Sequence, residues 1–297
     1  MGQKSLQGHT LPYLLLAPAM AAMGLFILYP IGYSVWLSLH KVDFLRPQAG
    51  RPFIGLQNYV KLFGDPTFWN ASQVTLVYTS IAVVASFVIG LATALLLNEQ
   101  FRGRVLARSI VIIPWAVPYV AAILIWKWML NTDFGIINYI LIKLGLFTDG
   151  INWLVSPIWA MVAVLVVTIW TQYPFITMMH LAALQGIAVE LHEAATIDGA
   201  GVLDRFRYIT WPGLSQVNTA AILLLVIWNF RKFTIIYTMT GGGPMRSTET
   251  LVIQTYRQAF SFYNMGYASA IGTVILGILL AFSVIYIVLQ YKTGQEV

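Results

Sequence analysis

The chain has 297 residues, of which 59% are apolar and 9% are charged, and its mean hydropathy is +0.76. Soluble globular proteins carry about 25% charged residues, so this composition excludes an ordinary water-soluble domain. The many aromatic residues exclude a disordered chain. The net charge of +6 is typical of a membrane protein whose Lys and Arg face anionic lipid. The absence of cysteine excludes disulfides and thiolate chemistry. We therefore expect an all-α polytopic membrane protein.

Six hydrophobic segments are long enough to cross a membrane, because a helix needs about 20 apolar residues to span the hydrocarbon core. Backbone polar groups in lipid must be satisfied within the segment, so each span is expected to be a helix. The expected spans are residues 11–36, 74–97, 109–130, 158–183, 215–239 and 268–290. We interpret residues 1–297 as a single transmembrane domain.

Shorter features are predicted within and between the spans. Pro114 and Pro118 predict a kink in the third span, since proline removes a helical hydrogen bond. Residues 37–73 contain an amphipathic run that predicts a short helix, and residues 134–139 predict a half-buried segment at the membrane interface. Both lie in connections that we place on the extracytoplasmic side of the membrane.

The distribution of Lys and Arg bears on the orientation of the spans. With both termini in the cytoplasm, the inner and the outer segments each contain seven of these cations. The inner segments are shorter, and the densest cluster is Arg102, Arg104 and Arg108. Because cytoplasmic loops are enriched in cations, this density favours cytoplasmic termini.

The polar stretch 185–213 differs from every other connection, because six charged side chains gather there between two apolar spans. Residues 185–200 predict a short helix, and Gly199 and Gly201 are expected to end it. Such a helix suits docking into a groove on a partner protein. A solvated connecting loop is the alternative interpretation.

A motif in this stretch resembles the EAA loop of the permeases of ABC importers. Glu193-Ala194-Ala195 is followed at the family's spacing by Gly199 and then by Ile209-Thr210-Trp211-Pro212, with Trp where the family usually has Leu. The resemblance extends over most of the chain. Asn152-Trp153-Leu154 and the run Gly241 to Pro244 are similar to the carbohydrate-uptake branch, in the half of the permease pair that includes the maltose F-type permeases.

The resemblance implies a type I ABC importer permease with six transmembrane helices and both termini in the cytoplasm. It implies a heterodimer with a second homologous permease, two ATP-binding cassette subunits and an extracytoplasmic sugar-binding protein, in the cytoplasmic membrane of a bacterium or archaeon. Membrane lipid is a further partner, and no nucleic acid is expected. The residues of the coupling loop implied to contact the ATPase are Glu193, Ala194, Ala195, Asp198 and Gly199.

The sequence contains no phosphate-binding loop of the form Gly-x-x-x-x-Gly-Lys-Ser/Thr. That loop cradles phosphate with backbone amides and reaches it with the Lys. ATP and Mg²⁺ are therefore expected on the partner ATPase subunits, with no cofactor and no metal on this chain. We interpret the chain as a transport subunit and not an enzyme.

Charged residues inside a span are costly and indicate a functional site. Neighbouring helical positions differ by about 100°, so Arg231 and Lys232 cannot both face lipid, and at least one is expected at a hydrated cavity or a partner acid. In the resembled family the fifth helix lines the sugar path. Phe233 and Tyr237 lie four residues apart, which suits either stacking on a sugar or helix packing. The candidates for the substrate path are Asn229, Arg231, Lys232, Phe233 and Tyr237.

Two alternatives to sugar import remain open at this point. An ABC permease for a non-sugar solute would share the EAA loop, and only the features around Asn152 and Gly241 to Pro244 favour sugars. A carrier or channel that does not use ATP would commonly show two repeated halves, which this sequence lacks.

Overall fold

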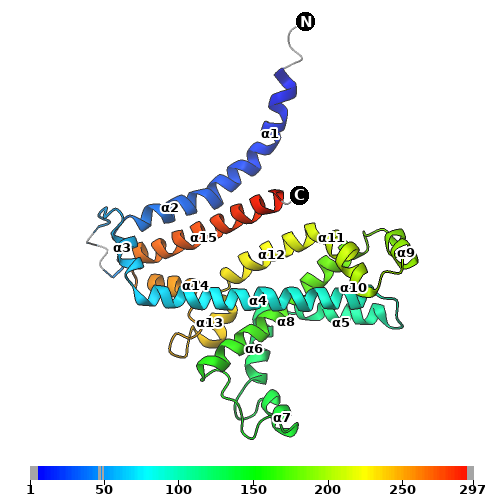
Figure 1. The fold of residues 1–297 in the computed structure, drawn as a ribbon. Coiled ribbons are helices and arrows are strands. Elements are labelled where there is room, and N and C mark those ends of the chain that lie inside the picture. The colour runs from blue at the N-terminus through cyan, green and yellow to red at the C-terminus, as the bar shows by residue number, and fades with distance from the viewer. Residues whose placement is uncertain (1–5, 46–47, 49, 293–297) are drawn as a thin grey trace. The chain divides into compact units, whose positions relative to one another are not determined.

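The computed structural model describes residues 6–45, 48 and 50–292, and they form helices joined by short connections (Figure 1). Lys4 and Arg46, two of the cations counted above, and both chain ends lie outside the described residues. The helices and π-helical segments (η) are α1 Leu6–Met23, η1 Gly24–Leu28, α2 Tyr29–Ser38, α3 Gln57–Phe63, α4 Pro66–Asn98, α5 Arg104–Ala116, α6 Tyr119–Met129, α7 Ile136–Lys143, α8 Pro157–Leu184, α9 Val189–Ile197, α10 Val202–Arg205, η3 Phe206–Thr210, α11 Trp211–Gly213, α12 Ser215–Phe230, α13 Thr234–Thr240, α14 Leu251–Tyr256, η4 Arg257–Ser261 and α15 Met265–Lys292.

The helices account for four membrane spans, or up to six if each bent pair is one span, which agrees with the predicted all-α membrane fold. Four helical stretches are long and apolar enough to cross a membrane: Leu15–Ser38, Pro66–Asn98, Pro157–Leu184 and Met265–Val288. Two further spans arise if each of two bent pairs counts as one, α5 with α6 and the α10–α11 segment with α12. Each of the six predicted segments coincides with one of these spans.

The third span is sharply bent, as its prolines predict. α5 and α6 meet at an angle of 94°. Val117, which precedes Pro118, has φ −68° and ψ 136°, an extended conformation. Proline clashes with a helical residue before it and so drives that residue out of the helix. The bend borders a cavity beside α5.

The fifth span is not the continuous helix that the hydropathy of residues 215–239 predicts. α12 ends at Phe230 and α13 begins at Thr234, so Arg231, Lys232 and Phe233 form a break. No Pro or Gly stands there. The two cations follow the last carbonyls of α12, where the negative end of the helix dipole favours positive charge. The prediction of one uninterrupted helix was therefore wrong at this point.

The chain divides into two compact units. One joins the first part of the chain, up to Phe68, with Gln254–Gly277, and the other contains Trp69–Ile253 together with the chain from Ile278 onward. The prediction of one transmembrane domain stays a prediction. In the first unit the buried side chain of Asn58 donates to the carbonyls of Ser38 and His40, at 2.7 and 3.2 Å, which fixes α3 beside the end of α2.

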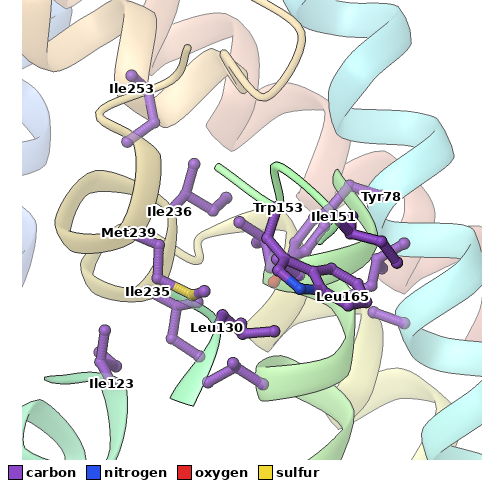
Figure 2. Packing of buried hydrophobic residues seen from close by; sticks show 14 residues of the cluster. Tyr78, Ile123, Leu130, Ile151, Trp153, Leu165, Ile235, Ile236, Met239 and Ile253 are labelled. Atoms are coloured by element: carbon purple, nitrogen blue, oxygen red, sulfur yellow. The ribbon is translucent and has the colours of Figure 1, made fainter. Parts of the chain in front are cut away.

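The core of the second unit lies where α4, α6, α8 and α13 meet (Figure 2). Its fully buried members include Ile123, Ile235 and Tyr78. The Tyr78 hydroxyl lies 2.8 Å from Thr168 Oγ1, so the one polar atom that this ring carries into the core has a partner. Small residues bring α4 and α8 close together, as is usual between membrane helices. A Cβ on Gly90 would lie 2.6 Å from Ile176 Cγ2.

The two predicted features outside the spans are present as helices. The run within residues 37–73 forms α3, and the segment predicted at 134–139 forms α7, which begins at Ile136. Asn138 of α7 is buried and accepts hydrogen bonds from the Ile151 amide and the Trp153 indole. It also donates to the carbonyls of Thr132 and Ile151. One amide side chain therefore holds the connection between α6 and α8 together.

Candidate functional site

The connection between α8 and α12 contains a short helix, α9, at the surface of the described chain. It spans Val189–Ile197, shorter than the predicted residues 185–200, and none of its residues is buried. Gly199 follows it with φ +83°, a left-handed conformation that favours glycine. The Ala200 amide donates to the Ala195 carbonyl at 2.9 Å, which closes the end of the helix. Gly199 thus ends the helix as predicted.

The coupling residues predicted from the EAA motif all lie on or directly after α9. Glu193, Ala194, Asp198 and Gly199 are exposed, and Ala195 is half-buried. Three large apolar side chains of the same helix are also exposed: Val189, Leu191 and Ile197, the last at 86%. α9 therefore leaves most of its motif residues and three of its apolar side chains uncovered by the described part of the chain.

The base of α9 is anchored to the transmembrane helices. Leu97 of α4, Leu184 of α8 and Leu214 before α12 are buried in one cluster. Arg205 Nη1 donates to Thr196 Oγ1 at 3.2 Å, which ties α10 to α9. The Gly201 amide donates to Asp204 Oδ2 at 3.2 Å and caps α10. The connection is therefore packed against the ends of α4 and α8.

A cavity of about 320 Å³ lies inside the second unit, beside the bend between α5 and α6. Trp115, Phe175 and Trp228 form its aromatic wall, with ring centroids 6.1 Å apart for Trp115–Phe175 and 5.1 Å for Phe175–Trp228. A volume near 300 Å³ is at the small end of the range for ligand pockets. Aromatic faces beside polar groups are suited to a hydroxyl-bearing ligand with apolar faces.

Gln172 in the polar wall of the cavity and its hydrogen-bonding partner Asn229 each keep one polar atom without a partner in the described part of the chain. Gln172 lines the cavity, and its side-chain oxygen accepts a 3.1 Å hydrogen bond from the buried Asn229. Gln172 Nε2 and Asn229 Oδ1 are buried and unpaired. Buried polar groups are nearly always paired, so unpaired ones indicate a site for water or a ligand.

The two cations in the break of the fifth span, Arg231 and Lys232, lie in different surroundings. Lys232 lines the cavity, and its Nζ lies 5.7 Å from the centroid of the Tyr119 ring, a cation–π distance. Arg231 is exposed and does not line the cavity. Lys232 is therefore the residue of the two that the fold directs toward a polar interior space.

The remaining predicted candidates lie on α13 or directly before it. Phe233 and Tyr237 stack with ring centroids 4.9 Å apart, so they share a face as their spacing predicts. Phe233 packs against the core of Figure 2, and neither ring lines the cavity. Of the predicted candidates, Lys232 lines the cavity, and Asn229 is connected to it only through its hydrogen bond to Gln172. Arg231, Phe233 and Tyr237 do not line it.

Most of the cavity wall was not predicted from the fifth span. The residues that were not predicted come from the bend, from α8 and, for Trp228, from α12. Gln172 carried a usable signal, because a buried amide inside a span is a functional indication. The aromatic members carried none, since Trp and Phe are ordinary in a span. The missed lining residues are Pro114, Trp115, Val117, Tyr119, Thr171, Gln172, Phe175 and Trp228.

Comparisons with known proteins agree on one family. Residues 86–293 match the family model described as "Binding-protein-dependent transport system inner membrane component". The chain is 38% identical to the trehalose/maltose transport system permease protein MalF of Thermococcus litoralis, over 93% of this chain and 92% of that protein. It is also 38% identical to the sulfoquinovosyl glycerol transport system permease protein SmoG of Agrobacterium fabrum, over 93% and 89%.

Solved structures show the same fold. A bacterial alginate ABC transporter in complex with its alginate pentasaccharide-bound periplasmic protein contains a chain that matches with a TM-score of 0.83 and 21% identity. The match covers 98% of this chain and 97% of that chain. Together, the exposed α9, the bent spans and these likenesses establish that the protein belongs to the family of inner membrane components of binding-protein-dependent transport systems, the permease subunits of ABC importers.

Proposed function

We propose that this permease translocates a sugar or glycoside. The observation that carries the proposal is the cavity between the bend, α8 and α12, where three aromatic rings face Gln172 and Lys232. Sugars have apolar faces that stack on aromatic rings and hydroxyl groups that bond to polar side chains. The relatives named for trehalose/maltose and for sulfoquinovosyl glycerol support the same substrate class.

The Lys232 ammonium favours a substrate that offers an acceptor or a negative charge. A cation in a space of low dielectric interacts strongly with an anion, and also donates hydrogen bonds to neutral hydroxyl groups. Among sugars, an anionic glycoside therefore gains most from this cavity. An ABC permease for a non-sugar solute is the alternative, and no feature of the cavity favours it.

We further propose that α9 docks on an ATP-binding cassette subunit. Two such subunits bind ATP and Mg²⁺ and drive the change between inward-facing and outward-facing states, while this chain binds neither. A second permease completes the pathway, and an extracytoplasmic binding protein delivers the substrate. This assembly places α9 and both termini in the cytoplasm and the chain in the cytoplasmic membrane. The exposed apolar residues of α9 and the family membership support it.

The test compares the two neighbouring cations in sugar uptake by cells that carry the complete transporter. Lys232→Gln keeps most of the side-chain volume and removes the charge. Uptake at subsaturating sugar is expected to fall about tenfold, the effect of losing roughly 1.4 kcal/mol of interaction. Arg231→Gln, the matched control, is expected to transport at the wild-type rate. Wild-type uptake by Lys232→Gln, with the protein present in the membrane at normal level, would refute the cavity as the substrate site.

A further inference from the structure

A second cavity, which the proposed sugar pathway does not use, lies behind α9. Its volume is about 1180 Å³, and it is bounded by the end of α4, the start of α5, the end of α8 and the α9–α10 segment. All of these elements belong to the second unit. Figure 1 shows α9 and α10 beside the ends of α4 and α5. The cavity therefore opens where the transmembrane helices end, next to the coupling loop.

The cavity is strongly basic. Arg104 and Arg108 reach it from successive turns of α5, and Arg205 reaches it from α10. Glu99 is the acidic residue among the lining side chains. The lining therefore contains three guanidinium groups and one carboxylate. Guanidinium groups donate hydrogen bonds in a planar fork that matches the oxygen atoms of phosphate or carboxylate.

Two of these guanidinium groups are held in position with part of their donors unused. Arg108 Nη2 donates to the Leu97 carbonyl at 3.0 Å, and Arg205 Nη1 donates to Thr196 Oγ1 at 3.2 Å. The Nε atoms of both are buried and have no partner in the described part of the chain. A buried charged donor without a partner is costly, so the fold retains two donors that an anion would satisfy.

The helix α5 carries an exposed apolar surface on the side away from the cavity. Positions 104 and 108 face the cavity, whereas Leu106, Ile110 and Ile113 are exposed on the same helix at 66%, 55% and 51%. At about 100° per residue, these three residues lie on the side of α5 opposite the two arginines. A helix with exposed apolar residues and with cations at its end is typical of a segment that meets the headgroup layer of a membrane.

We infer that the cavity behind α9 binds a phosphate ester, supplied either by the headgroup of an anionic phospholipid or by a soluble phosphate ester. The arginines supply the donors, and the volume exceeds what a bare phosphate ion requires. Because Arg205 contacts both the cavity and Thr196 of α9, a bound phosphate ester would stiffen the position of the coupling helix. The inference does not depend on the sugar pathway.

Native mass spectrometry of the purified full-length chain in a non-ionic detergent tests this inference. Phosphatidylglycerol is titrated against phosphatidylcholine, with glycerol phosphate as the soluble phosphate ester. The wild type is expected to retain phosphatidylglycerol over phosphatidylcholine. Arg104→Gln is expected to bind it about tenfold more weakly, because one charge-assisted contact is lost, and Arg104→Lys is expected to recover part of the affinity.

Arg102→Gln is the matched control, since Arg102 belongs to the same basic cluster but does not line the cavity. It is expected to bind as the wild type does, and thermal unfolding shows whether each variant is folded. Binding of glycerol phosphate that Arg104→Gln also weakens would support the phosphate-ester site with a soluble source. The inference would be overturned if a folded Arg104→Gln variant retained both phosphatidylglycerol and glycerol phosphate as well as the wild type does. It would also be overturned if Arg102→Gln lost as much affinity as Arg104→Gln. Neither outcome bears on sugar transport, so this test fails or succeeds separately from the proposed function.

Discussion

Buried amide side chains take two contrasting forms in this protein. Asn138 has all its hydrogen-bonding capacity satisfied by the connection between α6 and α8. Gln172 and Asn229 satisfy each other in part and leave one atom each unpaired. A fully paired amide stabilises a single structure, whereas a partly paired amide leaves an interaction for another molecule. At the scale of single residues, this difference separates the structural position of Asn138 from Gln172, which lines the cavity.

The structural role of Asn138 leads to a prediction about stability. Asn138→Ala leaves the Ile151 amide and the Trp153 indole without their acceptor, at a cost of about 1–3 kcal/mol for each buried group. We expect a clearly lower thermal midpoint for the purified variant in detergent. Asn152→Ala is the control, because Asn152 is exposed in the same connection. An unchanged midpoint for Asn138→Ala would show that the network contributes little to stability.

At the scale of elements, the short polar helices and the bends are the informative parts. α9 was predictable because charged residues, a small-residue run and a terminal glycine coincide in a stretch between two apolar spans. The bend at Pro118 was predictable because proline has a fixed local effect. The break at Arg231 to Phe233 was not, since hydropathy continues through it and no residue there forces a helix to end.

The end of α9 gives a prediction that separates backbone conformation from side-chain volume. A Cβ at Gly199 meets no atom within 4 Å, but its φ of +83° is unfavourable for any other residue, by about 1–2 kcal/mol. Gly199→Ala is therefore expected to fray α9 and to lower uptake several-fold, while the protein still inserts in the membrane. Uptake is measured with transporter of equal abundance.

Gly201→Ala provides the comparison for this prediction. Gly201 has φ −69°, and a Cβ there would meet Asp204 Oδ2 at an ordinary 3.5 Å. It is expected to transport normally. Equal loss of uptake in both variants would mean that the conformation at Gly199 is not what matters. The two glycines lie two residues apart, so both variants perturb the same connection.

At the scale of the whole molecule, the spans were far more predictable than the cavity. A span is a local property of about 20 consecutive residues. The cavity wall collects Trp115, Gln172 and Lys232 from three parts of the chain, and only the folded arrangement brings them together. Of the candidates, Lys232 lines the cavity, and Asn229 is connected to it through its hydrogen bond to Gln172. Phe233 and Tyr237, their neighbours in sequence, do not line it.

The proposed orientation predicts which side of the membrane each loop occupies, and the absence of native cysteine allows a direct test. A single cysteine at Ala195 is expected to react with a membrane-impermeant thiol reagent only after the cytoplasm is opened. A cysteine at Asp149, exposed in the connection between α7 and α8, is expected to react in intact cells. The reverse pattern would contradict the proposed topology.

In the assembled transporter, the Ala195→Cys variant is further expected to form a disulfide with a cysteine placed in the docking cleft of the ATPase. Such a bond requires α-carbons within roughly 7 Å. The Asp149→Cys variant serves as the negative control, because its loop lies across the membrane. Free reaction of Ala195→Cys with a bulky reagent and no crosslink in the assembled transporter would exclude docking of α9.

The close contact between α4 and α8 has a mechanical consequence. Pro174 interrupts the hydrogen bonds of α8 between the cavity residue Gln172 and the start of the coupling loop, and would by itself make that helix a hinge. Gly90 of α4 packs against this part of α8 without room for a methyl group. A Cβ at Gly90 would lie 2.6 Å from Ile176 Cγ2 and 3.2 Å from the Tyr173 carbonyl oxygen. α4 therefore packs against α8 at the point where Pro174 weakens it. If α9 docks as proposed, a displacement of α9 would be transmitted along α8 to the cavity with little bending at Pro174.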